Sequence, residues 1–148
     1  MNIEQLYRQV IMDHYKYPKN KGFVADNTYM TVHLNNPSCG DEMTVQLKIE
    51  DQKIVDVKQQ GTGCSICCSS ASVMSVTLKE KTIDDALAII KEFYELIKGY
   101  PFNKDILTGD AVVYQGVSQF PARVKCATLA WKAAEQAIIK TKEDTSNG

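Results

Sequence analysis

With 148 residues, the chain is expected to form a single domain, residues 1–148, with a core of its own. Its 44% hydrophobic and 24% charged residues are typical of a globular protein, and a net charge of −1 argues against binding to nucleic acid or an anionic membrane. No segment approaches the roughly 20 apolar residues of a membrane span, and residues 1–15 lack the apolar core of a secretory signal. We therefore expect a cytoplasmic protein, whose five cysteines favour metal binding or thiol chemistry over disulfides.

The chain opens with the pattern of an amphipathic helix over residues 2–16. His14 extends the apolar face of this helix, and we interpret it as a packing residue rather than a metal ligand. Residues 17–22 contain proline and glycine and end the helix. The apolar face recurs every three or four positions, at Ile3, Leu6, Tyr7, Val10, Ile11 and His14.

Alternating apolar and polar residues predict three strands, at about residues 30–35, 43–50 and 55–57. The short turns between them favour an antiparallel meander with one face open to solvent. The first turn contains Cys39 and Asp41, and in an extended loop residues two apart can point the same way. Taken alone, this pattern also fits an ordinary turn capped by the aspartate.

Residues 61–68 predict a strand that turns sharply into a helix. Gly61 and Gly63 allow the backbone to bend and to approach its neighbours closely. Cys64 then begins a helix of about residues 65–79, where the helix dipole and free N–H groups stabilise a thiolate. We interpret Cys67 and Cys68 as small packing side chains, with extra thiols near the site as the alternative.

The next helix opens at residues 82–85, which resemble a capping box with aspartate in place of glutamate, and it ends at Lys98. Residues 100–120 have no clear periodicity, and we expect irregular structure there with a short helix near residues 103–107.

The last helix follows Pro121 and carries Cys126 in its first turns. The polar segment 141–148 is expected to be disordered. Together the elements predict an α+β fold, in which helices pack on one face of a three-stranded antiparallel sheet.

Three cysteines fall at ends of the predicted elements: Cys39 in a turn, and Cys64 and Cys126 at helix starts. Asp41 accompanies the first of them. Three thiolates and a carboxylate suit a tetrahedral Zn²⁺. The set lacks the paired Cys-x-x-Cys of a zinc finger, so the spacing alone leaves scattered buried cysteines as the alternative.

Three motifs in the sequence are more specific than this spacing. They are Asn-Pro-Ser-Cys-Gly-Asp at 36–41, Gly-Thr-Gly-Cys-Ser-Ile at 61–66, and the stretch from Gln-Gly-Val-Ser at 115–118 to Phe-Pro-Ala-Arg-Val-Lys-Cys-Ala-Thr-Leu at 120–129. With these motifs the chain resembles the IscU/NifU-like iron–sulfur cluster assembly family, in its SufU branch. The resemblance implies a SufE/NifU-like fold, with the metal ligands at Cys39, Asp41, Cys64 and Cys126.

Two features within this resemblance match the SufU branch. Lys125 stands where the scaffold branch has a histidine, and the scaffolds lack much of the segment at about 100–120. The branch implies a zinc-dependent sulfurtransferase whose catalytic Cys39 accepts persulfide sulfur from a SufS-like cysteine desulfurase and passes it on for iron–sulfur cluster biogenesis. In similar proteins a histidine of the desulfurase displaces the loop cysteine from zinc.

Several alternatives stay open beside this reading. The same ligands could assemble a transient [2Fe–2S] cluster on a scaffold, or zinc could be purely structural. Downstream iron–sulfur assembly proteins are further expected partners. Arg123 and Lys125 could offset the negative charge of four anionic ligands or meet an acidic partner, or they could simply form a solvated helix start.

Overall fold

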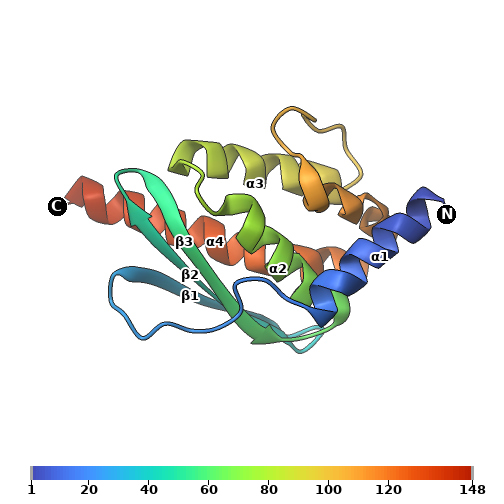
Figure 1. Ribbon diagram of the computed structural model, residues 1–148, viewed down its shortest axis with the longest axis horizontal. Coiled ribbons are helices and arrows are strands. Elements are labelled where there is room, and N and C mark those ends of the chain that lie inside the picture. Colours follow the sequence, from blue (N-terminus) through green and yellow to red (C-terminus); the bar gives the residue numbers. More distant parts are fainter. Residues whose placement is uncertain (1, 148) are drawn as a thin grey trace.

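The computed structural model describes residues 2–147, with side chains described through residue 144. Three strands form one antiparallel sheet in the order β1–β2–β3, and the helices pack around it (Figure 1). This arrangement confirms the predicted α+β class and three-stranded sheet. In chain order the elements are α1 (Ile3–Lys16), β1 (Tyr29–Asn36), β2 (Asp41–Glu50), β3 (Lys53–Thr62), α2 (Ser65–Leu78), α3 (Ile83–Ile97), the 3₁₀-helix η1 (Gly109–Gln119) and α4 (Pro121–Asn147).

The core lies between the sheet and the helices α2 and α4. Side chains alternate across a strand, so Met43, Val45 and Leu47 of β2 all point to the same face, and all three are buried. Helix α4 packs against β1 and β2, while α2 packs against β3 and α4. The buried face of the sheet therefore positions the first turns of both helices near the same edge.

The opposite face of the sheet is less open to solvent than the alternation predicted. Gln46 lies on that face and is nevertheless buried, because its side-chain amide bonds both the N–H and the C=O of Val24, at 2.8 and 2.7 Å. The backbone of Gln59 in β3 likewise bonds Asn20 and Gly22. The linker between α1 and β1 thus covers part of the outer face of the sheet. The alternation of residues along one strand cannot predict this contact, because it involves a distant segment of the chain.

Trp131 of α4 lies at the centre of the helical layer. Its indole stacks on Phe93 of α3, with ring centroids 4.0 Å apart and planes 10° from parallel. The indole N–H donates to Ser70 Oγ of α2 at 2.9 Å, and Ser70 Oγ–H donates to the Ala127 carbonyl at 2.6 Å. One buried side chain therefore joins three helices, and each of its polar neighbours is hydrogen-bonded.

His14 is buried at the end of α1, which confirms its interpretation as a packing residue. Its Nδ1 lies 2.7 Å from Ser72 Oγ of α2, and its Nε2 lies 2.8 Å from Asp110 Oδ2 of η1. Ser72 Oγ also accepts a hydrogen bond from the Lys19 backbone at 2.8 Å. The imidazole thus ties the N-terminal helix to two other elements.

The predicted short helix near 103–107 is wrong: residues 104–106 form a turn, and the helical segment is η1. Ala111, Tyr114 and Val117 recur every three residues and are all buried, which is the repeat of a 3₁₀-helix rather than an α-helix. The Tyr114 hydroxyl donates to Ser69 Oγ at 2.7 Å. Contacts with α2 and α3 therefore help to hold this segment in place.

Helix α4 is longer than expected and continues to Asn147, so residues 141–147 are helical where the sequence predicted disorder. The segment contains neither proline nor glycine, the Thr141 hydroxyl donates to the Ala137 carbonyl at 2.9 Å, and Lys142 Nζ lies 3.7 Å from Asp84 Oδ1 of α3. Gly148 lies outside the described residues. Within residues 2–147, no helix is long and apolar enough to cross a membrane.

Candidate metal centre

The turn between β1 and β2 positions Cys39 and Asp41 differently. The Asn36 carbonyl accepts hydrogen bonds from the N–H groups of Cys39 and Gly40, at 3.2 and 3.0 Å, and Gly40 has a φ of +71°, which suits glycine. Cys39 lies exposed at the tip of this turn, whereas Asp41 begins β2 and is only 1% exposed. The turn therefore holds an exposed cysteine beside a buried carboxylate.

Gly63 brings the end of β3 against this carboxylate. A Cβ on Gly63 would lie 2.5 Å from Asp41 Oδ1, so no larger residue fits without moving the carboxylate. The N–H of Cys64 then donates to the same oxygen at 3.1 Å. Cys64 is the N-cap of α2, as predicted, but its side chain makes no capping hydrogen bond.

Cys126 completes the group from α4. It is fully buried, and its Sγ lies 3.5 Å from Cys39 Sγ and 3.7 Å from the Ala122 carbonyl oxygen, either of which its single thiol proton can meet. The potential ligand atoms of Cys39, Asp41 and Cys126 all lie within 4.8 Å of one another, a cluster found in a search of the described residues. The structure thus brings three of the four predicted ligands into one compact group.

Cys64, the fourth predicted ligand, lies beside this group rather than within it. Burial raises the pKa of the Cys126 thiol above its ordinary value. The thiol of Cys64 lies close enough to that of Cys126 for its charge to raise the pKa of Cys126 further. The four side chains are therefore neighbours, with Cys64 at one side.

The surroundings of Asp41 show whether this group of side chains suits a metal ion. Among the described residues, its Oδ2 is the one buried side-chain oxygen or nitrogen without a hydrogen-bond partner. An unpaired buried carboxylate oxygen is costly, and a cation would satisfy it. Thiols and a carboxylate are also ligands that Zn²⁺ accepts. The residues present fit a zinc ion.

Arg123 lies in the first turn of α4, next to the thiols. Its hydrogen bond to Cys126, and then the charge of Cys64, raise the pKa of its guanidinium. The arrangement places a cation where several anionic ligands would gather. Lys125, which the sequence analysis considered together with Arg123, is exposed.

The two extra cysteines of α2 differ from each other. Cys67 is buried, which confirms its packing interpretation, and burial followed by the charge of Asp41 raises the pKa of its thiol. Cys68 is half-buried, and its thiol donates to the Gly63 carbonyl at 3.6 Å. Cys68 also borders a separate hollow of about 320 Å³ together with Lys21.

Sequence reasoning gave no role to Asn36, although it begins the first motif. Its side-chain Nδ2 donates to Cys39 Sγ at 3.5 Å. The only signal in the sequence was a polar residue three positions before the cysteine, which is also an ordinary turn residue.

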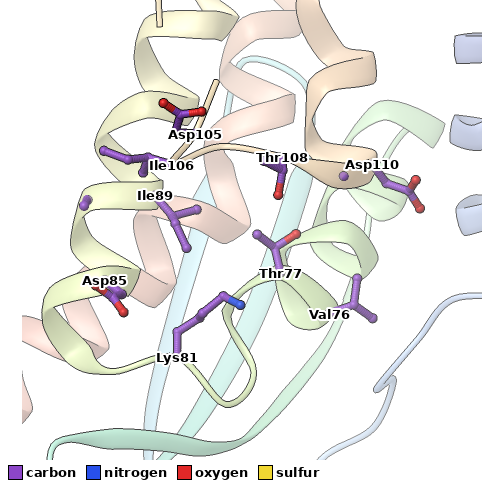
Figure 2. A pocket seen from close by; sticks show the side chains of 11 residues that line it. Val76, Thr77, Lys81, Asp85, Ile89, Asp105, Ile106, Thr108 and Asp110 are labelled. Carbon is purple, nitrogen blue, oxygen red and sulfur yellow. The ribbon is translucent and has the colours of Figure 1, made fainter. Parts of the chain in front are cut away.

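A hollow of about 610 Å³ opens elsewhere, between α2, α3 and the loop that leads into η1 (Figure 2). Its lining includes Lys81, Asp85, Ile89 and Thr108 but no cysteine. The cluster of Cys39, Asp41 and Cys126 lies instead at the surface, where Cys39 is exposed.

The fold and the cysteine–aspartate group together define a small α+β domain with a candidate metal centre. The family model described as the NifU-like N-terminal domain matches residues 6–127. The chain therefore belongs to the NifU-like N-terminal domain family.

Individual relatives agree with this assignment. The chain is 47% identical to the zinc-dependent sulfurtransferase SufU of Bacillus subtilis (strain 168), over 94% of this chain and 93% of the relative. It is 38% identical to the iron–sulfur cluster assembly scaffold protein IscU of Streptococcus pyogenes serotype M1, over 94% and 86%. The solved structure of an iron–sulfur cluster assembly scaffold protein for the SUF system from Fervidobacterium islandicum AW-1 superposes with a TM-score of 0.83 at 36% identity, covering 91% of this chain and 98% of that one.

Proposed function

We propose that this protein is a zinc-dependent sulfurtransferase, which accepts persulfide sulfur from a cysteine desulfurase and passes it on for iron–sulfur cluster biogenesis. The observation that carries the proposal is the exposed thiol of Cys39 at the edge of a group whose other members, Asp41 and Cys126, are buried. The similarity to the Bacillus subtilis zinc-dependent sulfurtransferase supports it.

Cys39, Asp41, Cys64 and Cys126 would hold the Zn²⁺. The unpaired Asp41 Oδ2 and the close thiols of Cys39 and Cys126 support this ligand set. Bound there, Zn²⁺ would keep the thiols deprotonated and temper their reactivity. Arg123 would offset part of the negative charge of the ligands.

Cys39 would act as the nucleophile in the transfer step. Its thiolate attacks the outer sulfur of the persulfide on the desulfurase cysteine, which forms a new S–S bond on Cys39. The S–S bond of the donor breaks, its cysteine leaves as a thiolate, and the persulfide proton stays on the transferred sulfur. The exchange involves no net oxidation, so the transfer needs no separate reductant.

A second function, assembly of a transient [2Fe–2S] cluster on the same ligands, is favoured by the similarity to proteins named as scaffolds. Lys125 argues against it, because the scaffold branch carries a histidine before the third cysteine. A purely structural zinc fits less well, because the candidate ligand Cys39 is exposed rather than enclosed.

Metal analysis and sulfur transfer separate these functions. Protein purified without oxygen should contain about one zinc per chain, as a single tetrahedral site requires. After incubation with a SufS-like desulfurase and cysteine, mass spectrometry should locate a persulfide on Cys39. Iron with the absorption of a [2Fe–2S] cluster, and no persulfide, would favour the scaffold instead.

Removal of the metal should loosen the two segments that meet at the site. Residues 36–41 and 120–126 come from distant parts of the chain, so part of the metal-binding free energy holds them together. Hydrogen–deuterium exchange should become faster there after chelation. The paired centre of β2 and β3 around Val45 and Val57 serves as the control and should change little. Unchanged exchange at the site segments would count against this role of the metal.

A further inference from the structure

Asn36 forms the base of the turn that carries Cys39. It is the last residue of β1, it pairs with Asp41 at the start of β2, and it is only 7% exposed. Its carbonyl accepts the N–H groups of Cys39 and Gly40, at 3.2 and 3.0 Å. The backbone of Asn36 therefore fixes where the turn begins and leaves its side chain directed at the tip.

The side-chain amide of Asn36 contacts the sulfur of Cys39. Nδ2 donates to Sγ at 3.5 Å, a distance suited to a hydrogen bond with sulfur. Cys126 Sγ also lies 3.5 Å from this sulfur. The side-chain amide of Asn36 has two N–H donors and carries no charge.

The contacts of Cys39 Sγ also differ in which element supplies them. Cys126 and the Ala122 carbonyl, 4.0 Å from the sulfur, belong to α4. Asn36 belongs to the same turn as Cys39. If the turn moved away from α4 toward a partner protein, the Asn36 amide would move with Cys39, whereas the contacts with α4 would be lost.

We propose that Asn36 is a positioning residue, whose side-chain amide directs the Cys39 sulfur and stabilises its negative charge while the thiol is exposed to the sulfur donor. The inference rests on the proposed function, in which Cys39 is the nucleophile. In this role the neutral Asn36 amide serves the exposed Cys39.

The substitution Asn36→Asp tests the role, because it keeps the shape of the side chain but replaces the donor with an anionic acceptor. In metal-free protein at one fixed pH, alkylation of Cys39 by iodoacetamide should slow about tenfold, since hydrogen bonds to charged groups are among the stronger ones. Alkylation of Cys64, measured on its own peptide by mass spectrometry, should stay within about twofold. A merely structural role would loosen the turn and speed the alkylation of Cys39.

Asn35→Asp is the matched control. It adds the same charge one residue earlier, on an exposed side chain of β1, and should leave the alkylation of Cys39 unchanged. Equal Cys39 rates in Asn36→Asp and Asn35→Asp would overturn the inference. If circular dichroism shows that Asn36→Asp does not fold, Asn36→Ala decides, because it removes the donor without adding charge.

The proposed function is tested separately, by persulfide on wild-type Cys39. A wild-type persulfide together with unaltered alkylation in Asn36→Asp would refute the role of Asn36 and leave the sulfurtransferase intact. Slowed alkylation without any wild-type persulfide would support the hydrogen bond and refute the sulfurtransferase, and with it the part of the inference that concerns sulfur transfer.

Discussion

Replacement of Cys39 with alanine is expected to reduce persulfide transfer to this protein to background. Cys39 is exposed, whereas Cys126 is fully buried and Cys64 is held at the start of α2. Cys64 is half-buried, so Cys39 is the most accessible thiol of the group. The measurement is persulfide formation by mass spectrometry, with alanine release by the desulfurase followed in parallel.

Cys68→Ser is the matched control for Cys39→Ala. It removes a half-buried thiol that hydrogen-bonds the Gly63 carbonyl, and it should keep most of the activity. Zinc should persist weakly in Cys39→Ala, on the remaining three ligands. A Cys39→Ala variant that stimulates the desulfurase as wild type does would refute the assignment. Persulfide found only on Cys126 would move the mechanism toward a scaffold.

Replacement of Trp131 with alanine is expected to have the largest effect on stability. The side chain is fully buried, stacks on Phe93, and donates to Ser70 Oγ. Its loss leaves a cavity among three helices, and such substitutions lower the free energy of unfolding by about 3–5 kcal/mol. Urea unfolding should be measured with a chelator present, so that metal binding does not contribute.

Ile139→Ala controls for a general effect of alanine in α4. This side chain lies on the same helix but is 43% exposed, so its loss should cost less than about 1 kcal/mol. Similar losses for the two variants would show that the stacked core around Trp131 contributes less than its burial implies.

The sequence predicted the parts of this fold that are encoded locally. Alternation along the strands placed β1 and β2 and the middle of β3, which extends beyond the predicted residues 55–57, and the glycines before Cys64 marked the turn into α2. The motif resemblance, more than the spacing of the cysteines, selected Cys39, Asp41 and Cys126 as neighbours. Their approach depends on how α4 docks on the sheet, which no local pattern describes.

The parts that were missed depend on contacts between distant segments. The 3₁₀-helix η1 is held by Tyr114 against α2, and the three-residue repeat of its buried side chains was hidden in an apparently irregular segment. From the alternation along β2, Gln46 was expected to face solvent. In the structure its side chain is covered by the linker, because it hydrogen-bonds the N–H and the carbonyl of Val24. Asn36 looked like a turn residue, and only the coordinates place its amide at the sulfur.

The candidate metal centre brings together Cys39 and Cys126, which are 87 positions apart in the chain. During synthesis on the ribosome, the hairpin with Cys39 and Asp41 is therefore made well before α4. At roughly 5–20 residues per second, the delay is about 4–17 s. Throughout that interval the nascent chain offers only a partial set of ligands, with the low affinity such a set implies. A metal ion that needs all of these side chains could therefore bind only after α4 has emerged from the exit tunnel and docked on the sheet.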